Sequence, residues 1–132
     1  MSTELITLPG PRPMGYAEAR IGRGRALHVA GQVGWKAGVF EAKDLVGQFA
    51  QALENILAIL AESQARPEHI VRLTWYITSR DEYHAERKHI GAAYRAVMGR
   101  HFPAMSVVQV VALMEAQAKV EIEATAVIPH AR

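Results

Sequence analysis

The sequence predicts a two-layer α+β domain in which two helices pack on one face of a mixed sheet. Three observations lead to this prediction. Apolar residues recur at helical spacing between residues 44 and 63. Residues 119–128 alternate between apolar and polar side chains, as a half-buried strand does. Residues 106–113 are almost wholly apolar and rich in valine, which suits a strand covered on both faces.

Length and composition predict a single domain over residues 1–132. Half of the 132 residues are hydrophobic, and two domains would each be too small to bury a core. Residues 1–15 are read as an extended lead-in, because prolines and glycines recur from Leu8 to Gly15. The 15 basic and 13 acidic residues are spread along the chain, so no basic cluster indicates nucleic acid. The lack of cysteine, of a leader and of a membrane span predicts a cytoplasmic protein.

The first half of the chain contains two predicted strands and a helix. The strands are expected at 16–21 and 26–33, and the glycines at 22–25 predict a tight hairpin between them. A loop follows over 34–42. The helix at 44–63 has one apolar stripe, formed by Leu45, Phe49, Leu53, Ile56, Leu57 and Leu60.

The second half repeats the pattern in the order strand, helix, strand, strand. Residues 69–78 alternate as a half-buried strand after Pro67. Ser79 and Glu82 have the spacing of a capping box, so a second helix is predicted from there to Met98. Its expected buried residues are Tyr83, Ile90, Tyr94 and Val97. Both helices then cover one sheet face, and the uncovered mixed face predicts an oligomer.

Few residues suggest chemistry by spacing alone. The six histidines form no pair at metal-ligand spacing, so no metal site is predicted. The arginine-glycine segment at 22–25 is too short for RNA binding and favours a turn. Glu121 and Glu123 share one side of the last strand, where they form either a solvated face or a general base in an interface pocket. The aromatic residues Tyr16, Trp75 and Tyr94 are read as core or interface residues more readily than as ligand contacts.

Taken together, seven segments resemble the RidA/YjgF family of reactive-intermediate imine deaminases, from about residue 16 to residue 127. These segments are Gly15-Tyr16, Val29-Ala30-Gly31-Gln32-Val33, Leu53-Glu54-Asn55-Ile56, Val71 to Thr78, Phe102-Pro103-Ala104, Val107-Val108-Gln109-Val110 and Val120-Glu121-Ile122-Glu123-Ala124. The resemblance implies a chorismate-mutase-like fold and a homotrimer whose sheets form an inner barrel. It also implies small-molecule pockets in the clefts between subunits and no cofactor.

The resemblance implies roles for particular residues. Glu121 stands where the family has a glutamate that positions or activates the attacking water, and Tyr16 and Tyr94 stand at tyrosine positions. After Phe-Pro-Ala, active relatives have an arginine that binds the substrate carboxylate, but this chain has Met105. A thioether cannot replace the forked, charged donors of a guanidinium, and the loss is expected to cost on the order of a thousandfold in rate on an anionic substrate.

Two more positions depart from the family, because Ala30 replaces a serine and Gly91 replaces an asparagine. Three functions therefore stay open. The first is hydrolytic deamination of an altered imine or enamine, with Met105 against an apolar substrate group and the Gly31 backbone donating hydrogen bonds. The second is a non-catalytic trimer that binds a small molecule or a protein. The third, RNA binding or cleavage, is given little weight. Whether Arg72 or Arg100 replaces the missing arginine is also open.

Overall fold

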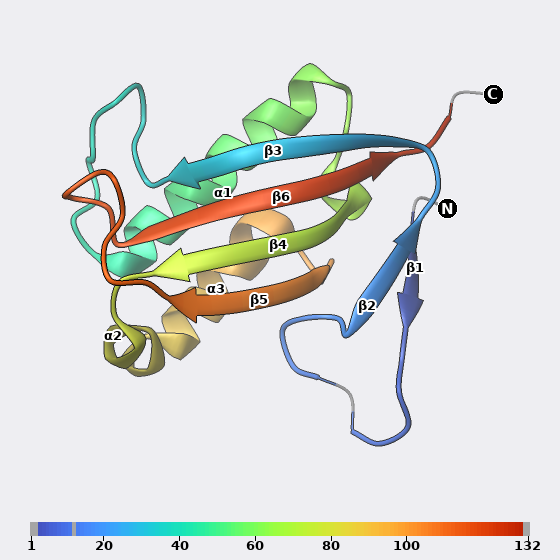
Figure 1. The fold of residues 1–132 in the computed structure, drawn as a ribbon, viewed down its shortest axis with the longest axis horizontal. Coiled ribbons are helices and arrows are strands. Elements are labelled where there is room, and N and C mark those ends of the chain that lie inside the picture. The colour runs from blue at the N-terminus through green and yellow to red at the C-terminus, as the bar shows by residue number, and fades with distance from the viewer. Residues whose placement is uncertain (1–2, 12, 131–132) are drawn as a thin grey trace.

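Helices cover one face of a four-stranded sheet in the computed structural model, which describes residues 3–11 and 13–130 (Figure 1). The strand order is β3 (Arg25–Val33), β6 (Val120–Ile128), β4 (Ile70–Ile77) and β5 (Ala104–Gln109). Both β3 and β4 pair with β6 in antiparallel register, whereas β5 runs parallel to β4. The predicted α+β class and mixed sheet are therefore confirmed.

The helix layer is built from the predicted apolar stripes. Helix α1 (Leu45–Glu62) begins at Asp44, whose side chain accepts a hydrogen bond from the Gly47 N–H. The predicted second helix is divided at Glu86 into α2 (Arg80–Ala85) and α3 (Arg87–Met98). A short 3₁₀ turn, Pro67–His69, leads into β4. The side chains that fill the core between helices and sheet include Phe49, Leu53, Ile56, Leu60, Ile90, Tyr94, Leu73 and Ile122.

Two details of the second predicted helix differ from expectation. The stripe that α3 buries contains Ile90, Tyr94 and Met98. The predicted Tyr83 and Val97 are only half-buried and pack at the margin of the core. Ser79 caps α2 as predicted, because its hydroxyl accepts a hydrogen bond from the Glu82 N–H at 3.1 Å.

The predicted hairpin between residues 16–21 and 26–33 is wrong. Strand β2 (Ala19–Gly22) pairs instead with β1 (Thr3–Ile6), which lies in the lead-in expected to be irregular. Gly24 has φ +145° and passes against the Ile128 carbonyl, where a β-carbon would overlap the backbone. This backbone geometry turns the chain out of β2 and into β3 beside β6, so the glycines form a crossing between two sheets.

The valine-rich strand is shorter than predicted and open on one side. It ends at Gln109, and Val111 beyond it is fully exposed. Within one protomer its outward face has no cover, since Val108 is 43% exposed. The expectation of burial on both faces therefore does not hold for the isolated chain.

A polar side chain joins α1 to the loops at one end of the sheet. Gln48 is almost completely buried, with its amide nitrogen donating to the carbonyls of Ala42 and Gln117 at 3.3 and 2.9 Å. Its amide oxygen accepts from the Lys119 N–H at 2.8 Å, one residue before β6 begins. One buried amide thus pairs three backbone groups that would otherwise lose their hydrogen bonds.

We predict that Gln48→Ala lowers the free energy of unfolding by about 2–4 kcal/mol, because buried backbone groups are left unpaired. Urea unfolding at fixed protein concentration measures the change. The matched control is Gln51→Ala on the same helix, where the lost hydrogen bond goes only to the Asn55 side chain. Equal effects of the two substitutions would contradict the role assigned to Gln48.

Candidate functional site

The sheet face opposite the helices carries most of the polar side chains of the strands. Strand register and alternation place there Glu121, Glu123 and Thr125 of β6, Arg72, Thr74 and Tyr76 of β4, Ser106 of β5 and His28 of β3. Strand β2 (Ala19–Gly22) approaches one end of this face, where Gly22 lies against the Val127 side chain. Glu121, one of the residues predicted from the sequence, lies on this face, which makes the face a candidate functional site.

Glu121 lies on β6 between Val33 of β3 and Tyr76 of β4. Its half-buried carboxylate rests against Gly31, where a β-carbon would overlap it. A register shift between Val29 and Gln32 makes room for this contact at the edge of the sheet. Within the described residues, no hydrogen-bond donor is paired with the Glu121 carboxylate. Its oxygens are therefore available to a ligand or a water molecule.

Glu123, two residues along the same strand, is already engaged. Its carboxylate accepts a 2.7 Å hydrogen bond from the Tyr76 hydroxyl, and this bond raises the pKa of the Tyr76 phenol. The nearby Arg72 donates to the Ser106 hydroxyl at 3.4 Å. The two glutamates of the strand thus differ in what they can do, since only Glu121 lacks an internal partner among the described residues.

Tyr94 lies on the other side of the sheet, in the core. Its hydroxyl donates to the His101 carbonyl at 2.5 Å, and its ring stacks on Phe102 with centroids 5.3 Å apart. Burial raises the pKa of Tyr94 far above its ordinary value. In one protomer this tyrosine is a core residue, and it does not share a cavity with Glu121.

The remaining predicted residues lie near opposite edges of the sheet. Met105 is on the edge strand β5 beside Leu73, half-buried against the main core. Tyr16, 42% exposed, lines a cavity of about 390 Å³ near the start of that strand. Ala30 lies in β3, which is the other edge.

In the single chain, the predicted site residues are therefore divided into two groups. Glu121, Ala30 and Gly31 lie at or next to the β3 edge, whereas Met105 and Tyr16 lie at the β5 edge. Sequence reasoning missed Tyr76 as the hydrogen-bond partner of Glu123. Strand alternation placed Tyr76 on a polar face, but only the register between β4 and β6 brings these two residues together.

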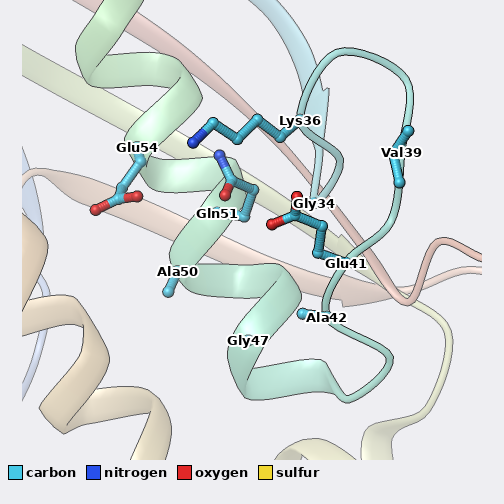
Figure 2. A pocket seen from close by; sticks show the side chains of 9 residues that line it. All are labelled: Gly34, Lys36, Val39, Glu41, Ala42, Gly47, Ala50, Gln51 and Glu54. Carbon is cyan, nitrogen blue, oxygen red and sulfur yellow. The ribbon is translucent and has the colours of Figure 1, made fainter.

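Another hollow, of about 170 Å³, lies between α1 and the loop that follows β3. Figure 2 shows Lys36 extending from that loop across α1 toward Gln51, with Glu41 and Glu54 nearby. This hollow contains none of the predicted site residues.

In residues 3–11 and 13–130, no group of three or more histidines or carboxylates is placed to hold a metal ion. Over the same residues, no helix combines the length and the apolar character needed to cross a bilayer.

Known proteins are similar to this chain in architecture and in sequence. The family model described as endoribonuclease L-PSP matches residues 11–128. The chain belongs to this family, which is the RidA/YjgF family. The Rid family protein YyfB of Yersinia pestis has a structure that superimposes with a TM-score of 0.84 at 33% identity, covering 97% of this chain and 100% of that one.

Two curated proteins are similar to this chain by sequence. Protein DfrA of Myxococcus xanthus is 33% identical over 125 residues, which is 89% of this chain and 88% of the relative. The 2-iminobutanoate/2-iminopropanoate deaminase of Salmonella typhimurium is 31% identical over 132 residues, covering 96% of this chain and 98% of the relative. The fold and the family implied by the sequence resemblance are therefore confirmed.

The contact between Gly31 and Glu121 predicts a strong coupling between the two positions. Gly31→Ala should lower the free energy of unfolding by about 1–3 kcal/mol, because the new methyl overlaps the carboxylate. In a Glu121→Ala background the cost should largely disappear, since the overlapping atoms are gone. A double-mutant cycle by urea unfolding measures this coupling.

The control for this cycle is Gly91→Ala in α3. Only the flexible end of Arg95 approaches that site, so the substitution should be neutral or stabilising. If Gly31→Ala costs the same with and without the Glu121 carboxylate, the close contact described above is wrong.

Proposed function

We propose that this chain is a hydrolytic deaminase of an imine or enamine metabolite, with a substrate preference altered from that of its relatives. The observation that carries the proposal is the Glu121 carboxylate, which is half-buried over Gly31 and has no partner within the described residues. The Salmonella relative named as an imine deaminase supports the reaction class.

In the proposed reaction, water adds to the carbon of the C=N bond. Glu121 orients this water and accepts one of its protons as the C–O bond forms. The proton passes to nitrogen and gives a tetrahedral adduct with one hydroxyl and one amino group. The hydroxyl proton then moves to the amino nitrogen as the C–N bond breaks, so that ammonia leaves and the oxygen stays as the carbonyl of the other product. One water is consumed for each ammonia released, and no cofactor takes part.

The proposal requires more than one copy of the chain. Glu121 with Gly31 and Tyr16 with Met105 lie toward opposite edges of the sheet. A closed ring of identical subunits brings the β3 edge of one copy against the β5 edge of the next, which joins the two halves. We propose a homotrimer with three such clefts, in which the uncovered sheet faces line an inner barrel.

The alternative is a trimer that binds a small molecule or a protein without catalysis. The packing of two predicted pocket residues favours it, because the Tyr94 hydroxyl is hydrogen-bonded to the His101 carbonyl and Met105 lies on the core side of β5.

The family model is described as an endoribonuclease. The even spread of charge along the chain gives no support to RNA cleavage. A cytoplasmic location belongs to the proposal, since it suits a chain without cysteine.

The first test is ammonia release from imines generated freshly from alanine, leucine and phenylalanine by an amino acid oxidase. Glu121→Gln should slow the reaction about 100-fold or more, because the amide cannot accept the proton. The matched control is Glu123→Gln, two residues along the same strand face, which should keep most of the rate because Glu123 is bonded to Tyr76.

Two outcomes would remove the deaminase proposal. One is that the wild-type protein accelerates release from none of these imines, and the other is that Glu121→Gln is as fast as the wild type. Either result would leave the binding alternative, and the ligand of the cleft would then be the quantity to find.

A second test concerns the shared cleft. Glu121→Gln and Tyr16→Ala affect opposite halves of it, so each variant alone should be slow. After subunit exchange between equal amounts of the two, about a quarter of the clefts should be intact, with that share of wild-type activity restored. Activity that stays at the level of the separate variants, with exchange verified by mass spectrometry, would show that each cleft belongs to one copy.

A further inference from the structure

The cavity that Tyr16 lines is built by the N-terminal segment against the start of β5. Its volume is about 390 Å³, which is enough for a small organic molecule. The walls are largely apolar and include Leu5, Ile6, Leu8 and Phe102, together with three prolines. Figure 1 shows β2 near the start of β5, with β1 paired to the far side of β2, and the Ala17 N–H donates to the Pro103 carbonyl at 3.0 Å. The cavity therefore adjoins the segment that leads into Met105.

Arg20 is fixed at this cavity by two hydrogen bonds. Its Nε donates to the Phe102 carbonyl at 3.0 Å, and its Nη1 donates to the Thr3 hydroxyl at 3.2 Å. A guanidinium has five N–H donors, so these two bonds leave three unused. The Arg20 side chain also lines a second hollow, with Thr3, Glu68 and His101. The side chain is half-buried, which strengthens its interaction with an anion compared with a fully hydrated cation.

A second arginine, Arg100, lines the same cavity. Of the described residues around it, Glu18 is the one that carries a negative charge, so the two arginines leave a net positive charge. Both arginines lie close to Phe102, because Arg20 donates to its carbonyl and Arg100 lines the same cavity as its side chain. The two arginines thus place positive charge beside the apolar side chains of the cavity wall.

We infer that this cavity binds the carboxylate of an apolar organic acid through Arg20 and Arg100. The apolar body of the ligand packs on Leu5, Leu8 and Phe102, and Tyr16 lines the same cavity. The inference rests on the proposed function in one respect, because it takes the organic acid bound in this cavity to be the substrate of the proposed deaminase. The substrate would then be an imino acid with a branched or aromatic side chain.

The test uses the full-length Glu121→Gln protein, so that turnover plays no part, and two probes of the same shape. The probes are 3-phenylpropanoate and its neutral amide, and titration calorimetry measures their binding. The carboxylate should bind about tenfold more tightly than the amide, because charged pairs with arginine are the stronger ones. Arg20→Gln with Arg100→Gln should abolish this preference, and Arg100→Gln alone should reduce it.

Two controls separate charge from folding. Arg23→Gln, at an exposed position on the turn after β2 and outside the cavity, should leave the preference unchanged. Arg20→Lys should keep part of it, since it retains the charge while losing the fork. Far-ultraviolet circular dichroism verifies that each variant is folded.

Equal affinity for the two probes, no binding of the carboxylate, or a preference that survives the double substitution would each overturn the inference. The result is separable from the proposed function. If the protein prefers the carboxylate but does not accelerate imine hydrolysis, the inference about this cavity stands and the deaminase proposal is contradicted. If the protein hydrolyses imines but does not prefer the carboxylate over the amide, the deaminase proposal stands and the role assigned to Arg20 and Arg100 is contradicted.

Discussion

The alternation of side chains along β6 is the constraint on which the rest of the structure depends. Val120, Ile122, Ala124 and Ala126 enter the core beneath the helices, so the intervening residues must face the other way. Because β6 lies between β3 and β4 and pairs with both, its register cannot slip by one residue without exposing the whole apolar set. The same packing that forms the core thus fixes Glu121 on the uncovered face.

Local patterns predicted the fold where one face of an element is buried. Helix α1 and strands β4 and β6 were predicted to within one or two residues, because burial on one side leaves a clear period in the sequence. Strand β1 was missed, since four residues of which three are exposed leave no such period. The pairing of β2 was wrong because glycines close a hairpin or a crossing between sheets equally well, and the close approach of Gly24 to Ile128 decides between them.

The candidate site was predicted less completely, for a physical reason. Sequence places residues on faces of strands, but a site depends on which strands are neighbours. The order β3-β6-β4-β5 separates Glu121 and Gly31 from Met105 and Tyr16 by the width of the sheet. The distinction between Glu121 and Glu123 likewise comes from register, since Tyr76 bonds to one and leaves the other without a partner among the described residues.

Met105 lies on the edge strand β5, and the sequence resemblance implies that active relatives have a charged, flexible arginine at this position. Arg20 is held differently, because hydrogen bonds to Thr3 and to the Phe102 carbonyl fix its guanidinium before any ligand arrives. A group that is already ordered loses less side-chain entropy on binding, so it binds an anion more effectively than a mobile one. Arg20 lies beside the apolar side chains of the N-terminal segment, so a carboxylate bound there, as inferred above, would place an apolar group of the ligand against them. Under the inferred role of Arg20 and Arg100, Met105 would mark a change in where the carboxylate binds, and the proposed deaminase would still recognise it.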